Sequence, residues 1–182
     1  MLEVITGAME AGKTWLIYKR ISDANLMGKK VQVFAYPVHK GEVVSRIGFK
    51  HDAITVPTIA EIEASLEPDV DTIAIDDAQL FDRDDLLHFC DKWRNRMTII
   101  IAGVQLNSFG ENFGAMVQLM GRAENVTVLL GVCEKCKEQN ALVSQRYRDL
   151  AHTKPITKDD PKIDLRKEYY APVCWKCYQP PL

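Results

Sequence analysis

Short, continuously apolar runs recur along the chain, and longer stretches with the apolar spacing of helices lie between them. Continuous apolarity over a few residues is typical of strands that are buried on both faces, as in a parallel sheet. Strict alternation would instead indicate a sheet with one face in water. The predicted strands are Leu2–Thr6, Val31–Tyr36, Ala53–Val56 (the weakest), Thr72–Asp76, Thr98–Val104 and Val126–Val132.

The stretches between these strands predict helices. Thr58 followed by Glu61 forms a T-x-x-E capping box, which is a typical helix start. The predicted helices are Gly12–Met27, Thr58–Leu66, Arg83–Arg96 and Gly114–Ala123. Strands that alternate with helices predict an α/β fold, in which helices cover both faces of a mostly parallel sheet.

The character of the chain changes after Val132. Residues 133–182 contain few strand-like runs but hold four of the five cysteines. A segment of about 50 residues cannot bury enough apolar surface by itself, so we expect a metal site to stabilise it. We therefore divide the chain into a first domain over residues 1–130 and a small second domain over residues 131–182.

Composition narrows the class of protein. The net charge of −2 argues against a dedicated nucleic-acid or membrane-surface binder. No apolar run approaches the ~18–20 residues that span a bilayer, and the opening MLEVITG lacks the basic start of a signal peptide. We therefore expect a cytoplasmic protein without nucleic-acid or membrane partners, whose five cysteines are thiols or metal ligands.

The clearest motif is the octapeptide Gly7-Ala8-Met9-Glu10-Ala11-Gly12-Lys13-Thr14, which fits G-x-x-x-x-G-K-[ST]. It follows a predicted strand and opens a predicted helix, which is the context that the P-loop requires. Backbone N–H groups and the helix N-terminus then bind phosphate oxygens, Lys13 reaches the β- and γ-phosphates, and Thr14 ligates Mg²⁺. The alternative is an ordinary glycine turn. We predict a P-loop domain of RecA-like type.

A carboxylate at the end of an apolar strand commonly completes a P-loop magnesium site. Asp76 ends the predicted strand Thr72–Asp76 and is the candidate magnesium ligand, whereas Asp77 would point elsewhere and act as a base. Alternatively, the two aspartates simply end a strand and begin a turn.

Two C-x-x-C pairs, Cys133/Cys136 and Cys174/Cys177, predict a four-cysteine zinc site. Four thiolates leave no open coordination position, so such a zinc ion would be structural. A redox dithiol and unligated core cysteines are the alternatives. Cys90 lies in a predicted helix, where a buried thiol is expected.

These motifs, in this order, resemble the thymidine kinase family, specifically the zinc-containing, tetrameric type II members. The similarity extends over nearly the whole chain. The matching segments are GAMEAGKT (Gly7–Thr14), IDDAQLF (Ile75–Phe81), SFGENFG (Ser108–Gly114), SQR (Ser144–Arg146) and YAPVCWKC (Tyr170–Cys177).

The resemblance implies transfer of the γ-phosphoryl group of ATP to the 5′-hydroxyl of thymidine or a close pyrimidine deoxynucleoside. It also implies a zinc-binding lasso domain and a homotetramer. Asp77 takes the place of the family's catalytic glutamate, and Gln79 joins the nucleotide-binding set. The implied nucleoside-binding residues are Met9, Leu80, Phe113, Ser144, Ile163 and Tyr170.

The departures from the family pattern cluster on the acceptor side. Aspartate replaces glutamate at Asp77, and the chain between Tyr36 and Val43 lacks the family's D-x-R, with His39 or Lys40 as the nearest substitutes. Further departures are Leu80, Gln105, Ser108, Phe109, Leu165 and Arg166.

Two rival functions belong to other classes. One is a catalytically weak nucleotide-binding homologue with a regulatory or assembly role. The other is a zinc-ribbon ATPase that acts on nucleic acid, which the net charge and the lack of an aromatic-plus-basic surface motif disfavour.

Overall fold

A computed structural model describes residues 1–37, 42–44, 50–166 and 169–182 of the chain. Within them, six strands form one sheet in the order β5-β2-β6-β7-β1-β8, and every pairing between neighbours is parallel. Its strands are β1 (Leu2–Gly7), β2 (Val31–Ala35), β5 (Ile54–Thr55), β6 (Thr72–Asp76), β7 (Thr98–Gly103) and β8 (Asn125–Leu129). The predicted α/β fold with a parallel sheet is confirmed.

Alternate residues of the central strands are buried in two separate cores, one on each face of the sheet. On β7, Ile99 and Ile101 belong to the larger core, whereas Ile100 belongs to the smaller one. On β6, Ile75 and Ala74 divide in the same way. Burial on both sides is the reason why these strands read as continuous apolar runs.

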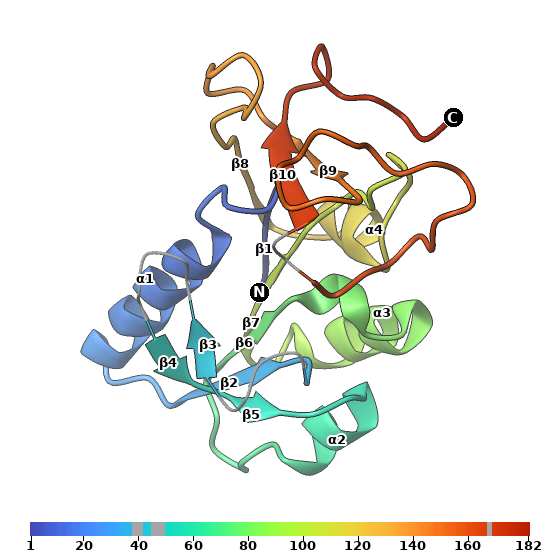
Figure 1. Ribbon diagram of the computed structural model, residues 1–182. Helices are drawn as coiled ribbons and strands as arrows, with labels where there is room; N and C mark the ends of the chain where they lie inside the picture. Colours follow the sequence, from blue (N-terminus) through green and yellow to red (C-terminus); the bar gives the residue numbers. More distant parts are fainter. Residues whose placement is uncertain (38–41, 45–49, 167–168) are drawn as a thin grey trace.

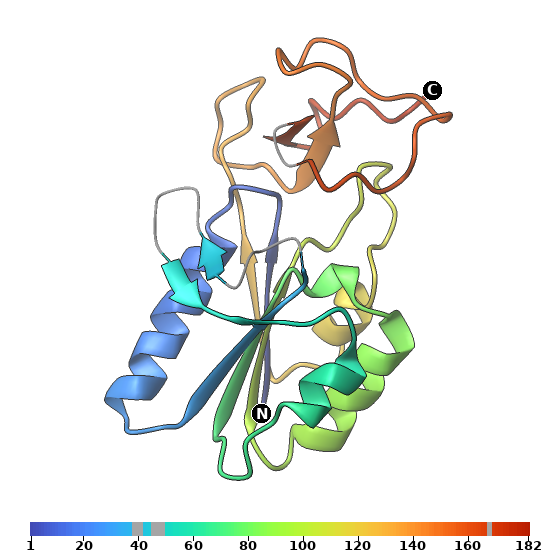
Figure 2. The ribbon, with the colours of Figure 1, turned by 60° about the horizontal axis from the view of Figure 1, so that its bottom comes forward.

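Helices supply the other side of each core. The smaller core receives Leu16, Ile17 and Ile21 from α1, whereas α2, α3 and α4 pack on the larger one. Figure 2 shows α1 on one side of the sheet and the other helices on the opposite side. Their bounds are α1 (Lys13–Leu26), α2 (Ile59–Ala64), α3 (Arg83–Trp93) and α4 (Met116–Met120), with a 3₁₀ turn η1 (Ala78–Leu80) before α3.

Several local predictions are confirmed. Thr58 is the N-cap of α2, as predicted: its side chain accepts the N–H of Glu61 at 3.3 Å, and its hydroxyl, not its backbone N–H, donates to the Glu61 carboxylate at 3.0 Å. Cys90 is fully buried in α3, where burial raises the pKa of its thiol to about 12. No described helix is long and apolar enough to cross a membrane.

Other boundaries were wrong. The helix predicted from Gly114 begins only at Met116, because Gly114 has a φ of 53° and a left-handed residue cannot continue a helix. The strand predicted to Val132 ends at Leu129, after which an isolated bridge joins Gly131 to Ala141. A two-stranded sheet, β3 (Glu42–Val44) with β4 (Lys50–Asp52), was missed.

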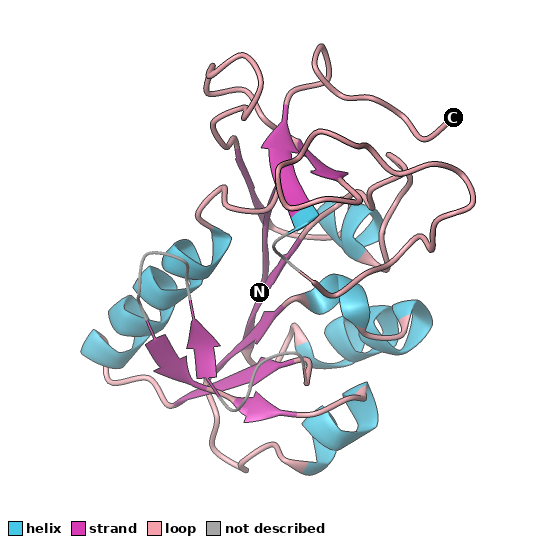
Figure 3. Cartoon of the chain, viewed as in Figure 1, coloured by secondary structure: helices cyan, strands magenta, loops and turns pink. Residues whose placement is uncertain are grey.

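The C-terminal residues lie beyond the carboxyl ends of β1 and β8 (Figures 1 and 2). They hold an antiparallel pair, β9 (Val143–Arg146) and β10 (Tyr170–Val173), which the sequence did not predict. Most of the remaining residues there form loops, as Figure 3 shows. The division at residues 130 and 131 stays a prediction.

Candidate functional site

The P-loop connects the end of β1 to the start of α1. Gly7 has a φ of 146° and Gly12 a φ of 96°, which are conformations that L side chains rarely adopt. A Cβ atom on Gly7 would also overlap the carbonyl oxygen of Leu129 on β8. Gly12 is the N-cap of α1, so the positive end of that helix faces the loop.

The last two residues of the motif, Lys13 and Thr14, make polar contacts with the loop and with β6. The Lys13 ammonium is mostly buried and donates to the carbonyl oxygens of Ala8 at 2.7 Å and Gly7 at 3.2 Å. The Thr14 hydroxyl donates to Oδ2 of Asp76 at 3.1 Å, and Asp76 is buried at the end of β6. These two side chains offer the oxygen ligands that Mg²⁺ prefers.

Two polar side chains from other elements hold the loop in place. Gln105 follows β7, and its Oε1 accepts the N–H of Gly7 at 3.0 Å. Ser144 on β9 accepts the N–H of Met9 through Oγ at 2.9 Å. Gln105 stands where the resemblance placed a departure from the family pattern, and its contact stabilises the start of the P-loop.

Asp77 lies between the end of β6 and the start of η1. Its backbone is left-handed, with a φ of 50°, and its Oδ1 accepts Nε2–H of Gln79 at 3.2 Å. Gln79 is buried, and its Oε1 accepts the N–H of Val104 at 3.1 Å. Gln79, predicted as a nucleotide contact, therefore orients the Asp77 carboxylate and ties it to the end of β7.

A single cavity of about 430 Å³ joins these groups. It is lined by the P-loop from Met9 to Thr14, by Asp76, Asp77 and Gln79, and by the six side chains predicted to hold a nucleoside: Met9, Leu80, Phe113, Ser144, Ile163 and Tyr170. Gly7 and Ala8 of the P-loop are not among the residues that line this cavity. The structure thus brings together, at one cavity, side chains that are far apart in the sequence.

One wall of the cavity is a segment that we call the lid, residues 162–165. The Tyr170 hydroxyl donates to the carbonyl oxygen of Asp164 at 2.8 Å, which fixes the lid to β10. The Arg166 guanidinium, with Nε at 3.0 Å from the Asp164 carboxylate, lowers the pKa of that group to about 2. The Asp164 carboxylate is therefore ionised at neutral pH.

The four cysteines of the two C-x-x-C pairs converge. Their sulfur atoms all lie within 4.8 Å of one another, and Sγ of Cys136 is 3.8 Å from Sγ of Cys174. Zn–S bonds of about 2.3 Å in a tetrahedron place sulfurs about 3.8 Å apart, so the cluster fits a zinc ion. Burial opposes ionisation of Cys133, but backbone N–H groups outweigh it and lower the pKa of Cys133 to about 6. A thiolate is the form that binds metal.

Sequence reasoning missed several cavity residues. Asn107, Lys162 and Asp164 line the cavity, and so does Trp15, which directly follows Thr14 on α1. The string Asn107-Ser108-Phe109-Gly110 carries a turn signal, asparagine first and glycine fourth, which could have located the Asn107 turn. No local sequence signal marks Trp15, Lys162 or Asp164 as a cavity residue. His39 and Lys40 lie outside the described residues.

A P-loop at the carboxyl ends of a parallel sheet, with a buried aspartate beside its threonine, defines a P-loop nucleotide-binding protein. A family model described as thymidine kinase matches residues 1–178. The chain is also 33% identical to thymidine kinases from two strains of Chloroflexus aurantiacus, J-10-fl and Y-400-fl, over 98% of this chain and 94% of each relative. The chain belongs to the thymidine kinase family, and it is a kinase that phosphorylates a nucleoside.

Proposed function

We propose that the chain transfers the γ-phosphoryl group of ATP to the 5′-hydroxyl of thymidine or a closely related pyrimidine deoxynucleoside. The observation that supports this most is the single cavity with the P-loop at one part of its lining and Leu80, Phe113 and Tyr170 at another. Asp77 lines the same cavity. The Chloroflexus relatives are thymidine kinases, which supports thymidine as the acceptor.

The donor half of the reaction rests on the P-loop. Backbone N–H groups of the loop and the N-terminus of α1 bind phosphate oxygens, and Lys13 neutralises their charge once its ammonium turns from the carbonyls of Gly7 and Ala8. Thr14 and Asp76 would hold Mg²⁺, which supplies further charge neutralisation on the phosphate oxygens when bound.

The acceptor half needs a group that takes the proton of the hydroxyl. Asp77 is the candidate base, and Gln79 keeps its carboxylate oriented. Apolar and aromatic side chains at Leu80 and Phe113 suit the faces of a nucleobase, while backbone groups near Ile163 in the lid would bind its polar edge.

A radiolabelled phosphate-transfer assay over all common deoxynucleosides tests this proposal, with ATP and with or without Mg²⁺. We expect phosphorylation of thymidine above the purine deoxynucleosides, and none without Mg²⁺. An Asp76→Asn variant should need more Mg²⁺ for half-maximal rate. A wild-type protein that binds ATP but phosphorylates no deoxynucleoside would overturn the proposal and restore the regulatory alternative.

We further propose a homotetramer and a cytoplasmic location on the family resemblance alone. Sedimentation equilibrium of the purified chain measures the assembly directly, and a monomer at micromolar concentration would contradict it.

A further inference from the structure

Residues 107–113 form a tight turn at the wall of the cavity, which we call the acceptor turn. The Asn107 side chain organises it, because Oδ1 accepts the N–H groups of Phe109 at 2.9 Å and Glu111 at 3.1 Å. The N–H of Asn107 donates to the Glu111 carbonyl at 2.9 Å, and the N–H of Gly110 donates to the Asn107 carbonyl at 3.0 Å. Several internal hydrogen bonds thus hold the acceptor turn in one conformation.

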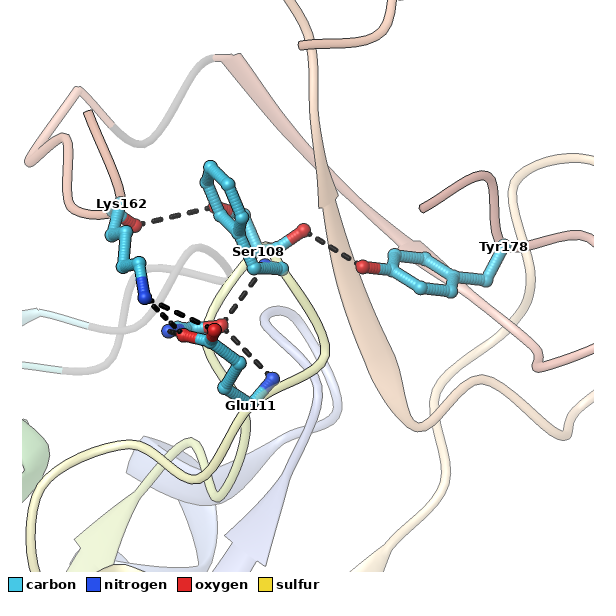
Figure 4. A network of polar contacts seen from close by, with 6 residues as sticks. Ser108, Glu111, Lys162 and Tyr178 are labelled. Carbon is cyan, nitrogen blue, oxygen red and sulfur yellow. Dashed lines mark hydrogen bonds and ion pairs between the residues drawn. The ribbon is translucent and has the colours of Figure 1, made fainter. Parts of the chain in front are cut away.

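The chain directly after the last cysteine of the cluster holds the acceptor turn from one side. Tyr178 follows Cys177, and its hydroxyl donates to the carbonyl oxygen of Ser108 at 3.0 Å, as Figure 4 shows. The same ring lies against Gly110, where an added Cβ would come within 3.4 Å of the Tyr178 hydroxyl. Gly110 has a φ of 76°, so the turn needs glycine there for its backbone as well.

The lid holds the acceptor turn from the other side through one residue, Lys162. Its ammonium lies 2.9 Å and 3.0 Å from the two carboxylate oxygens of Glu111, and 5.8 Å from the centre of the Phe109 ring. Its carbonyl oxygen accepts the Ser108 hydroxyl at 3.3 Å. Figure 4 shows Lys162 and Tyr178 on opposite sides of Ser108.

We propose that Tyr178 and Lys162 are positioning residues for the nucleoside, which hold the acceptor turn and the lid at the spacing that the acceptor needs. This rests on the proposed function, in which Phe113 of the turn and Ile163 of the lid contact the nucleoside. Asn107, Ser108 and Lys162 line the same cavity. Side chains other than Tyr178 and Lys162 contact the P-loop, namely Gln105 at Gly7 and Ser144 at Met9, so we expect ATP binding to change little when Tyr178 or Lys162 is replaced.

Tyr178→Phe removes only the hydroxyl that reaches Ser108. Loss of one such hydrogen bond raises the KM for the nucleoside and its dissociation constant by about 2- to 10-fold, with the KM for ATP and kcat unchanged within about 2-fold. Tyr147→Phe is the matched control, because the Tyr147 hydroxyl is buried in the same part of the chain and has no hydrogen-bond partner among the described residues. Its nucleoside KM should equal that of wild type.

Lys162→Met removes the charge but keeps the apolar stem, and Lys158→Met is the control for charge, since Lys158 is exposed and outside the cavity lining. The Lys162–Glu111 pair is exposed, so we expect about a 2- to 5-fold rise in nucleoside KM for Lys162→Met. Lys162→Met combined with Glu111→Gln should do no more than Lys162→Met alone, because both remove the same ion pair.

The readouts separate failure of this inference from failure of the proposed function. If the wild-type protein phosphorylates no nucleoside, the proposed function is wrong, and the assignment of the nucleoside-binding residues fails with it. An active wild type whose Tyr178→Phe and Lys162→Met variants keep wild-type nucleoside KM and binding overturns the positioning role alone. A rise in both nucleoside and ATP KM, or loss of zinc from Tyr178→Phe, would show a general structural role and overturn it as well.

Discussion

The Thr14 hydroxyl donates to the Asp76 carboxylate across 3.1 Å, which joins the first turn of α1 to the carboxyl end of β6. Thr14 is partly buried on α1, and Asp76 is almost fully buried at the end of β6. The Thr14 hydroxyl and the Asp76 carboxylate are therefore held by residues of a helix and a strand. The two ligands that a magnesium ion would need are therefore placed by the core of the fold, not by a flexible loop.

Lys13→Ala should reduce phosphoryl transfer by about 10²–10³-fold, because it removes the cation nearest the phosphates. Its ammonium is buried against two loop carbonyls, so unfolding free energy should fall by only about 1 kcal/mol. Steady-state kinetics and thermal melts measure the two effects. Lys19→Ala on the same helix is the control, since Lys19 pairs with Asp23 at the surface. Equal turnover in the two variants would remove Lys13 from the mechanism.

Gly7→Ala should destabilise the protein strongly and impair nucleotide binding. The new Cβ would overlap the Leu129 carbonyl at a residue whose φ is 146°. Gly28→Ala is a control for a left-handed residue without overlap, because Gly28 has a φ of 72° and nothing lies within 4 Å of its added Cβ. We expect a Tm drop of about 2–4 °C for Gly28→Ala, from backbone strain at an αL residue, and a drop of more than about 5 °C for Gly7→Ala, from a less tolerated φ together with the overlap. Similar drops in Tm for the two variants would show that β8 shifts to accommodate the new Cβ with little loss of stability.

The central strands and the P-loop could be predicted from sequence because each depends on local signals. Burial of β6 and β7 on both faces makes them continuously apolar, and the glycines of the P-loop are required by backbone conformation. The start of α2 was predicted for a similar reason, since its N-cap contact joins Thr58 and Glu61, which are only three residues apart.

The contacts within the rest of the site could not be predicted from local signals, because they join residues that are distant in the sequence. Ser144 and Met9 are 135 positions apart, and Tyr178 and Ser108 are 70 apart. The strands β9 and β10 were missed because each has only four residues, of which Val143 and Val173 pack in the small core around Cys133 and Cys174. The pairing of such short strands is evident only in the folded structure.

Zinc removal should unfold the C-terminal residues before the six-stranded sheet. The small core around Cys133 contains only a few apolar residues, among them Val143 and Val173, so metal–thiolate bonds would be its main stabiliser. We expect Cys174→Ser, or a strong chelator, to abolish hydrogen-exchange protection in β9 and β10 while β6 and β7 stay protected. Cys90→Ala is the control. Cys90 lies in the larger core of the sheet, so its replacement should leave the zinc content unchanged. Elemental analysis that finds no zinc in pure wild-type protein would contradict the prediction.

The last prediction concerns Asp77 as the base. Asp77→Asn should keep ATP binding but reduce turnover by about 10²–10⁴-fold, because the amide is nearly isosteric and cannot accept a proton. The fold should tolerate this change well, since asparagine favours the left-handed conformation that Asp77 adopts, with a φ of 50° and a ψ of 38°. Titration calorimetry with ATP and single-turnover kinetics separate binding from chemistry. If Asp77→Asn turns over like wild type, the proton leaves by another route.

Asp77→Glu is the sharper test, because it reinstates the longer carboxylate of the family pattern. Glutamate adopts a left-handed backbone less readily than aspartate, so the longer side chain should come with a small loss of stability. We expect activity to be restored or raised relative to wild type, provided that Gln79 still orients the carboxylate through its 3.2 Å contact. A Gln79→Ala background should remove that gain. Lower activity in Asp77→Glu with every nucleoside tested would instead show that the shorter carboxylate is matched to the way the acceptor lies in this cavity.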